Sequence, residues 1–335
     1  MGALSGVKVL DIATLYPAPL LAAMLGDFGA DVVKVEPPSG DPLRAVGTVP
    51  WAVAGRNKRS VVVDFDTDDG LDLLQQLIAV ADVIVCNQPA NLLERWRCTD
   101  AQIASCNPRA VIAHVSAFGA SGPQADLAGN GSLAEAFVGL GIGTVPLGDT
   151  MAAMSGVIGV LTALYARDAR EESKGRGHGP GQVVDVSMYE SLLPLLAPAI
   201  GGLSTSSVRS RHEIVDTNDG RTIAIAATTD AQRARLRELV GDDDVASWAA
   251  AQSAAAALVA LEGARVPAVV VNDIASLRVD PQVVARSSVV TVDGAAIPAP
   301  APKLSSTPGA VRHLGPALGE HTAAVVTEWL RGGTA

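Results

Sequence analysis

The sequence predicts an α/β protein with a doubly wound, Rossmann-like parallel sheet and a second, smaller α+β domain. Three observations support this prediction. Short β-branched runs alternate with helical patterns over the first 120 residues, a hairpin signal follows near residue 218, and 48% of the residues are apolar. Strands separated by helices favour parallel pairing, right-handed crossovers and helices on both faces. The apolar content suffices for a large core and excludes intrinsic disorder.

The predicted strands of the large sheet are short, and helical patterns separate them. The strands are expected over residues 7–13, 31–36, 60–65, 82–86, 110–116 and 182–186. Helices are expected over 19–28, from Asp69 up to the strand at 82, around 92–96 and over 101–106. The longest apolar run, Met151 to Ala166, has 16 residues. Because a membrane-spanning helix needs about 20, we expect a buried helix here.

A second domain is predicted after residue 204. Asn218-Asp-Gly220 separates two apolar runs and is typical of a tight hairpin turn. Helical patterns follow at 231–240 and 245–262, and another apolar run covers 266–271. We therefore expect a small α+β domain over residues 205–295, and a large domain formed by residues 1–204 and 296–335.

The charge balance excludes two classes of partner. The chain has 25 Lys and Arg residues against 35 Asp and Glu, which gives a formal net charge of −10. That sign does not suit non-specific binding to nucleic acid or to an anionic membrane. An anionic ligand must therefore be bound by a few positioned groups rather than by the overall field of the protein.

Cysteine usage and the first residues predict a cytoplasmic protein. Cys86, Cys98 and Cys106 are an odd number of cysteines without the spacing of metal ligands. The first residues lead directly into a predicted strand, without the charged and apolar regions of a secretion signal. A reducing compartment suits both observations.

The sequence carries no convincing metal or redox-cofactor motif. Gly139-Leu-Gly-Ile-Gly143 follows a helical pattern rather than a strand, so it fits a dinucleotide-binding loop poorly. The five histidines include no ligand-spaced pair, and His114, inside a predicted strand, is typical of a core histidine. The sequence has no Gly-x-Ser-x-Gly nucleophile motif either. We expect neither a metal ion nor a redox cofactor.

Asp149 is the candidate catalytic residue, and the sequence places it directly before a helix of small apolar residues. An aspartate there caps the helix by accepting backbone N–H bonds. A carboxylate beside an apolar wall can also act as a nucleophile or a base, and both roles stay open. Ligands of doubly wound sheets bind beyond the carboxyl ends of the strands. Here those segments are 14–19, 37–44, 87–91 and 116–123.

Ten short blocks of sequence, spread over nearly the whole chain, together form a recognisable ordered pattern. They include Val9-Leu-Asp-Ile-Ala, Leu25-Gly-Asp-Phe-Gly-Ala-Asp, Gly40-Asp-Pro-Leu-Arg44, Asn107-Pro-Arg-Ala, Gly148-Asp149, Gly181-Gln-Val-Val-Asp-Val, Asp280-Pro-Gln and Leu318-Gly-Glu-His-Thr322. One block is a weak signal, whereas the ordered series is a strong one. Together the blocks resemble the family III CoA-transferases, the CaiB/BaiF group that includes formyl-CoA transferase, carnitine CoA-transferase and the α-methylacyl-CoA racemases.

The resemblance implies a reaction and a nucleophile. The enzyme would move CoA from an acyl-CoA donor to a small carboxylic acid. Asp149 would attack the thioester to give a mixed anhydride, and the CoA thiolate would return to form an aspartyl-CoA thioester, which the acceptor acid then attacks. Desolvation and backbone N–H groups at a helix start suit such a carboxylate. The resemblance also implies an interlocked homodimer, in which each chain threads through a ring made by the other.

The same resemblance implies the residues that bind coenzyme A. The matching positions lie at the strand ends named above: Tyr16 and Pro17 by their backbone, Val63, Asp64, Asn87, Gln88, Arg95, Ser116, Ala117, Phe118 and Gly119. A guanidinium group suits the oxygens of a phosphate, so Arg95 is a candidate for contact with CoA. The alternative for Arg95 is a surface arginine without a ligand.

Two departures from the family pattern leave other functions open. Asn130 stands where the racemases carry a histidine, and asparagine cannot move a proton at neutral pH. An acyl-CoA racemase or epimerase acting on 2-methylacyl-CoA would need another base, such as Glu135, which itself departs from the transferase pattern. The other alternative is a catalytically silent homologue that only binds CoA. The sequence does not identify the acyl group or the acceptor.

Overall fold

The computed structural model describes residues 1–143, 145–172, 179–202 and 212–331, and in it the chain forms two compact units. The larger unit combines Met1–Pro194 with Ser287–Ala335, and the smaller one covers Leu195–Arg286. The predicted domain boundary between residues 204 and 205 lies outside the described residues, so the predicted domain limits stay a prediction. The two units are described separately below.

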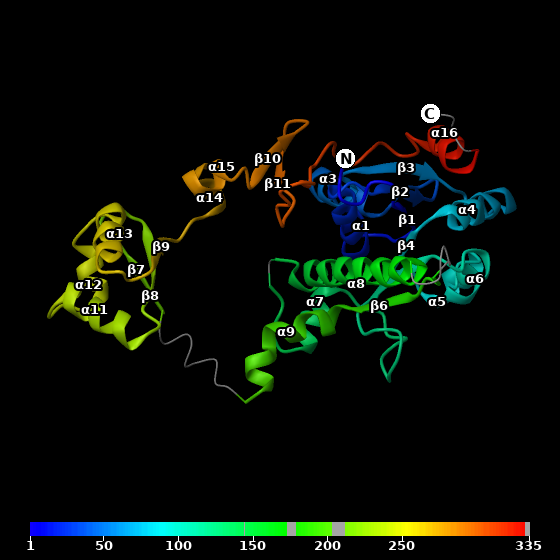
Figure 1. Ribbon diagram of the computed structural model, residues 1–335. Helices are drawn as coiled ribbons and strands as arrows, with labels where there is room; N and C mark the ends of the chain where they lie inside the picture. The colour runs from blue at the N-terminus through cyan, green and yellow to red at the C-terminus, as the bar shows by residue number, and fades with distance from the viewer. Residues whose placement is uncertain (144, 173–178, 203–211, 332–335) are drawn as a thin grey trace. The chain divides into compact units, whose positions relative to one another are not determined.

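A six-stranded parallel sheet forms the centre of the larger unit (Figure 1). Its strands are β1 (Lys8–Asp11), β2 (Asp31–Glu36), β3 (Lys58–Val62), β4 (Val83–Cys86), β5 (Val111–Ser116) and β6 (Val183–Ser187). They lie in the order β3-β2-β1-β4-β5-β6. This confirms the predicted parallel α/β sheet. The order reverses between β1 and β4, and doubly wound sheets bind ligands at such a point.

Alternating side chains of the strands divide the core of this unit in two. Val9, Val83 and Val85 face one side, whereas Leu10 and Ile84 face the other. Because successive strand residues point to opposite faces, both faces of the sheet are apolar and both are covered by helices.

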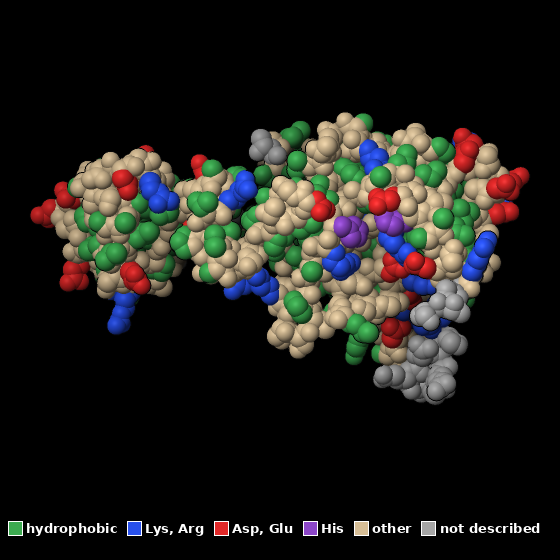
Figure 2. Space-filling view, turned by 90° about the horizontal axis from the view of Figure 1, so that it is seen from above, with side chains coloured by type: hydrophobic (Ala, Val, Ile, Leu, Met, Phe, Trp, Pro, Cys, Tyr) green, Lys and Arg blue, Asp and Glu red, His purple; other side chains and the backbone are tan. Residues whose placement is uncertain are grey.

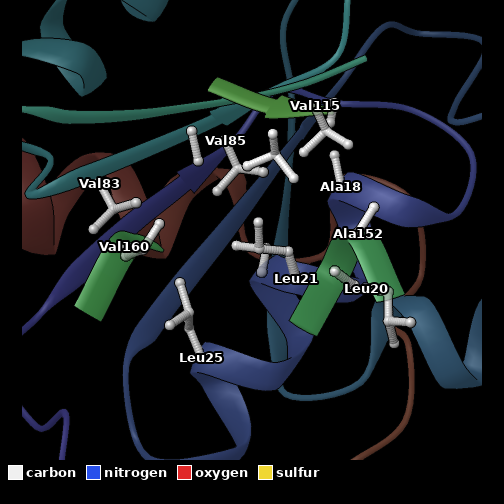
Figure 3. Close-up of a cluster of buried hydrophobic side chains, with 14 of the residues drawn as sticks. Ala18, Leu20, Leu21, Leu25, Val83, Val85, Val115, Ala152 and Val160 are labelled. Carbon is white, nitrogen blue, oxygen red and sulfur yellow. The ribbon is translucent and has the colours of Figure 1, made fainter. Parts of the chain in front are cut away.

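Helices α1 (Pro17–Asp27) and α8 (Leu147–Glu172) cover the first face (Figure 1). Figure 3 shows Leu21 and Leu25 of α1 and Val160 of α8 pointing toward Val83 and Val85 of β4. The other helices of this unit are α2 (Leu43–Val46), α3 (Thr48–Gly55), α4 (Asp68–Val80), α5 (Ala90–Arg95), α6 (Asp100–Cys106), α7 (Gly131–Phe137), α16 (Thr322–Val325) and the π-helix η1 (Val326–Leu330), and α9 (Met188–Ile200) begins in it and ends in the smaller unit. Of these, α4 and η1 pack on the second face.

Helix α8 is longer and less buried than the sequence predicts. Two glycines let it approach its neighbours: a Cβ on Gly156 would lie 2.1 Å from Leu21 Cδ1, and one on Gly159 would lie 2.5 Å from Val184 Cγ1. The opposite face is exposed, so the expectation of a buried helix is wrong for that face. By length and composition, residues Leu147–Ala169 could cross a membrane, but a helix that packs on a core passes the same test.

The smaller unit is an α+β structure built on three antiparallel strands. These are β7 (His212–Asp216), β8 (Thr222–Ala226) and β9 (Ala268–Val270), and the predicted hairpin turn joins the first two. The helices are α11 (Asp230–Val240), α12 (Val245–Ala250), α13 (Ala254–Gly263), α14 (Ile274–Val279) and α15 (Pro281–Ala285). The single helix predicted over 245–262 is wrong, because Ser253 caps a new helix by accepting the Ala256 N–H. Beyond this unit, β10 (Val289–Val292) and β11 (Ala295–Pro298) form a hairpin.

Candidate active site

Asp149 lies in the first turn of α8 and faces another helix. Helix α8 begins at Leu147, so Asp149 is its third residue, and the hypothesis that Asp149 caps the helix is wrong. Its carboxylate instead faces the backbone N–H of Gly131, the first residue of α7, which lowers the pKa of Asp149. The candidate nucleophile is therefore held at the junction of α7 and α8.

Two glycines bring the starts of these helices together. A Cβ on Gly131 would lie 2.6 Å from Asp149 Cγ, and a Cβ on Gly148 would lie 2.6 Å from the Gly131 carbonyl oxygen. No side chain fits at either distance. Asn130 caps α7, since its Oδ1 accepts the Leu133 N–H at 3.0 Å. The residue that replaces the racemase histidine thus has a structural partner here.

Glu135 is the second carboxylate at this junction. It lies on α7, is only 3% exposed, and its Oε1 accepts the backbone N–H of Gly148 at 2.8 Å. Burial raises the pKa of Asp149, and the charge of Glu135 raises it further, while the hydrogen bond from Gly131 opposes both. No Lys or Arg in the described ranges pairs with either carboxylate.

Tyr16, at the start of α1, lies within the electrostatic reach of Asp149. Burial raises the pKa of its phenol; Arg56 lowers it and the Asp149 carboxylate raises it. The preceding residue, Leu15, has a φ of +66° and donates its N–H to Asp41 Oδ1 at 3.1 Å. Pro17 follows as the first residue of α1 and is buried. The loop after β1 therefore brings Tyr16 within the electrostatic reach of the candidate nucleophile.

A cleft of about 680 Å³ opens beyond the carboxyl ends of β4 and β5. Five of the residues matched to CoA contacts line it, namely Asn87, Gln88, Ser116, Ala117 and Gly119. Asn87 also joins β4 to β1, because its amide donates to the Thr14 carbonyl at 2.8 Å and accepts the Thr14 N–H at 2.9 Å. The cleft thus adjoins the point where the strand order reverses.

The chain after β5 connects this cleft to Asp149. Ser116 Oγ accepts the N–H of Gly119, whose φ is +86°. A Cβ on Gly129 would lie 2.4 Å from the Cβ of Ala117, so the two segments touch. Gly129 lines the cleft and Gly131 contacts Asp149, so along the chain only Asn130 lies between the cleft residue and the residue that touches the carboxylate.

None of the six remaining predicted contacts lines the cleft. Tyr16 and Pro17 lie at the start of α1, and the other four lie elsewhere. Phe118 turns away and packs on Phe137, with ring centroids 5.4 Å apart. Val63 and Asp64 follow β3, and Arg95 forms an exposed ion pair with Asp66 at 2.6 Å. Phe65 and Trp96, the neighbours of Asp64 and Arg95, stack with centroids 4.1 Å apart. Residues Val63, Asp64 and Arg95 therefore form a second group, near the end of β3 rather than those of β4 and β5.

His114 is a cleft residue that the sequence did not indicate. It is half-buried and lines the cleft instead of lying in the core. Its place two residues before the end of β5 is the signal that could have suggested this. The cleft lining also includes Asp100 and Asp126, and it has no Lys or Arg among the described residues. No group of three His, Cys, Asp or Glu side chains in the described ranges is arranged to hold a metal ion.

The sequence model of CoA-transferase family III matches residues 4–247 and 241–322. The chain belongs to the family III CoA-transferases. It is 34% identical to the succinyl-CoA:L-malate CoA-transferase beta subunit of Chloroflexus aurantiacus, over 98% of this chain and 94% of that protein. It is 29% identical to the succinate:glutarate CoA-transferase of Agrobacterium fabrum, over 97% of this chain and 95% of that protein. The predicted enzyme class, a CoA-transferase acting on acyl-CoA, is confirmed.

Solved structures show that the family fold is shared. A CaiB/BaiF family protein from Brucella suis superposes with a TM-score of 0.84 at 24% identity, over 98% of this chain and 99% of that one. A hypothetical protein from Mycobacterium tuberculosis superposes with a TM-score of 0.84 at 22% identity, over 97% of this chain and 99% of that one. The alignment with the Chloroflexus relative extends over 388 positions, more than the 335 residues here, so that relative contains segments that this family III CoA-transferase lacks.

Proposed function

We propose that this enzyme transfers CoA from an acyl-CoA to a carboxylic acid through covalent intermediates on Asp149. The observation that carries the proposal is the placement of Asp149. Its carboxylate is partly buried, lacks a cationic partner among the described residues and lies next to the cleft that contains five matched CoA contacts. A carboxylate that is neither fully solvated nor neutralised is a better nucleophile than one in water.

The proposed reaction proceeds through two anhydrides and one thioester of Asp149. The Asp149 carboxylate attacks the thioester carbonyl of the donor, which gives a mixed anhydride and releases the CoA thiolate. The thiolate then attacks the aspartyl carbonyl, so that the donor acid leaves and an aspartyl-CoA thioester remains. The acceptor carboxylate attacks this thioester to form a second anhydride, and the returning thiolate takes the acceptor acyl group and frees Asp149. The Gly131 N–H is placed to donate to the charge that develops on the aspartyl oxygen.

We infer that the donor is succinyl-CoA and that the acceptor is a small dicarboxylic acid. Similarity to the enzymes from Chloroflexus and Agrobacterium supports this, because the first is named for succinyl-CoA and malate and the second for succinate and glutarate. On the face shown in Figure 2, cationic and anionic side chains lie beside one another, so no region of uniformly positive charge attracts the CoA phosphates there. Local groups such as Arg95 and backbone N–H donors would bind them instead.

Isotope exchange tests the proposal without knowledge of the acceptor. Labelled succinate should enter succinyl-CoA in the presence of the wild-type enzyme. In the Asp149→Ala variant the rate of this exchange should fall at least about a thousandfold, because the nucleophile is removed. It should still bind CoA. Asp69→Ala is the matched control, since Asp69 is an exposed carboxylate in the first turn of α4.

Other outcomes point to the alternative functions. Undiminished exchange by Asp149→Ala would sink the assignment of the nucleophile. Deuterium uptake at the α-carbon of a 2-methylacyl-CoA, in deuterated water without an acceptor acid, would support a racemase. Thermal stabilisation by CoA without turnover of any acyl-CoA and acid would support a silent binding protein.

We also propose that the enzyme is an interlocked homodimer. Met154, Ile158, Leu161 and Tyr165 lie on one side of α8 at spacings of four, three and four residues, and they are 45%, 67%, 39% and 77% exposed. Such an apolar stripe is typical of a helix that packs against another surface. A second copy of the chain is the occupant that the family resemblance implies. Light scattering at the mass of a monomer would contradict this proposal.

A further inference from the structure

Glu135 joins the two helices that hold the nucleophile. Its Oε1 accepts the N–H of Gly148 at 2.8 Å, and Gly148 directly precedes Asp149. The first N–H groups of a helix have no partner within the helix and carry the positive end of its dipole. Glu135 therefore satisfies one of the N–H groups at the start of α8, directly before Asp149.

The hydrogen bond from Gly148 accounts for the position of the Glu135 side chain, but it does not require that side chain to be charged. A glutamine at this place could accept the same N–H through its side-chain oxygen, without the cost of burying a charge. Glu135 is 3% exposed and forms no ion pair with the described Lys and Arg residues. Burial and the second carboxylate both disfavour the ionised form of Glu135. The hydrogen bond to Gly148 alone therefore does not explain why this residue is a glutamate.

Glu135 is the charged side chain that acts on the Asp149 carboxyl, with an effect smaller than those of burial and of the Gly131 N–H. Burial has the larger effect on the pKa of Asp149, and the charge of Glu135, on α7, raises that pKa further. From the start of α1, Tyr16 is neutral at ordinary pH, since burial and Asp149 raise its phenol pKa. Arg56 acts on Tyr16, but its guanidinium is held by Asp27 at 2.7 Å. The Asp149 carboxylate thus faces a like charge on one side and no unpaired described cation on the other.

We propose that Glu135 is a positioning residue that keeps Asp149 reactive, by binding the Gly148 N–H and by placing a second negative charge beside the nucleophile. The inference rests on the proposed function of Asp149. Because the helix start and its N–H groups are partly neutralised by Glu135, they stabilise the ionised Asp149 less. A less stabilised carboxylate attacks the donor thioester faster.

Three substitutions separate the charge of Glu135 from its structural role. Glu135→Gln keeps an acceptor for Gly148 and removes the charge. Glu135→Asp keeps the charge and withdraws it by one methylene, so the bond to Gly148 is lost. Glu262→Gln is the control, since Glu262 is an exposed carboxylate on α13. Circular dichroism and thermal unfolding establish that each variant is folded.

The first readout is a titration of Asp149 itself, which needs no activity. In protein labelled with ¹³C at the aspartate carboxyl, the signal of Asp149 is identified by its loss in Asp149→Asn. Removal of a neighbouring negative charge favours the ionised form, so Glu135→Gln should lower the pKa of Asp149. Glu135→Asp should leave it raised, and Glu262→Gln should not change it. An unchanged pKa in Glu135→Gln would overturn the proposal.

The second readout is the pH profile of succinate exchange. In Glu135→Gln, kcat should fall about tenfold, KM for acyl-CoA should stay within about twofold, and the acidic limb of kcat/KM should move to lower pH. A merely structural role would lower thermal stability without moving that limb. If the wild-type enzyme shows no exchange at all, the proposed function fails, and the titration of Asp149 still decides the role of Glu135.

Discussion

Two regions of the larger unit contain buried carboxylates, and the two regions differ in whether a cation lies beside each carboxylate. At the ends of β1 to β3, Asp11 lies 2.7 Å from Lys58 Nζ, and Asp41 lies 3.0 Å from Lys34 Nζ, with both lysines fully buried. At the junction of α7 and α8, the described groups that face Asp149 and Glu135 as donors are the backbone N–H groups of Gly131 and Gly148. The first region pairs each charge with a cation, and the second does not.

The pKa directions follow this difference. Burial alone would raise the pKa of Glu36, at the end of β2, but hydrogen bonds from Arg44 and Ser60 overcome it and the pKa lies below its ordinary value. Burial also raises the pKa of Asp149, and there the nearest charge adds to the shift. The neutralised carboxylates link neighbouring strands and loops of the sheet, whereas the proposed nucleophile has no such cation among the described residues. Perturbed carboxylates of the second kind are typical of active sites.

Removal of a buried cation should have the largest effect on stability. Lys58→Met leaves Asp11 without its nearest partner, and such a loss costs about 3–5 kcal/mol of the free energy of unfolding. Arg59→Met is the control on the same strand, because its partners Asp31 and Glu328 are partly exposed. The control should lose about 1 kcal/mol or less. Urea unfolding measures both, and equal losses would show that the paired region does not stabilise the fold in this way.

A methyl group at the α7–α8 junction should affect activity more than stability. In Gly131→Ala the new Cβ would lie 2.6 Å from Asp149 Cγ, so the carboxylate must move away from its donor. We expect kcat to fall about a hundredfold, which corresponds to about 2.7 kcal/mol of the activation barrier. Gly143→Ala is the control, since a Cβ there meets only the Val145 backbone at 3.9 Å. A normal kcat in Gly131→Ala would contradict the placement of the nucleophile.

The smallest effect should come from an arginine outside both regions. Arg95 is 60% exposed, and its ion pair with Asp66 contributes little, so it can turn to a CoA phosphate at low cost. Arg95→Ala should raise KM for acyl-CoA about tenfold, close to 1.4 kcal/mol, without changing kcat. Arg97→Ala is the matched control, because Arg97 is 50% exposed and pairs with Asp68. Equal KM values for the two variants would make Arg95 an ordinary surface residue.

The sequence predicts the sheet well because apolar alternation is a local signal. It misplaces β3, which starts at Lys58 rather than at Ser60, because a lysine in a strand gives no sign that a distant aspartate neutralises it. Val63 and Asp64 therefore follow the strand instead of ending it. Contacts of this kind join residues 47 positions apart, and no local pattern records them.

The candidate site was predictable to a similar extent. Asp149 and the residues after β4 and β5 follow from the strand ends and from the family blocks. The contact of Gly131 with Asp149 and the bond from Gly148 to Glu135 do not, because they depend on how closely two helices approach. His114 was assigned to the core for the same reason: a strand pattern does not show which side chains border a cleft.

The covalent state of Asp149 tests the central claim most directly. The enzyme should be mixed with succinyl-CoA and no acceptor acid, digested rapidly at low pH, and examined by mass spectrometry. We expect one CoA bound as a thioester on the peptide that contains Asp149, one succinate released per site, and neither product with Asp149→Ala. A peptide of unmodified mass in an enzyme that exchanges labelled succinate, or CoA attached to another residue, would contradict the account.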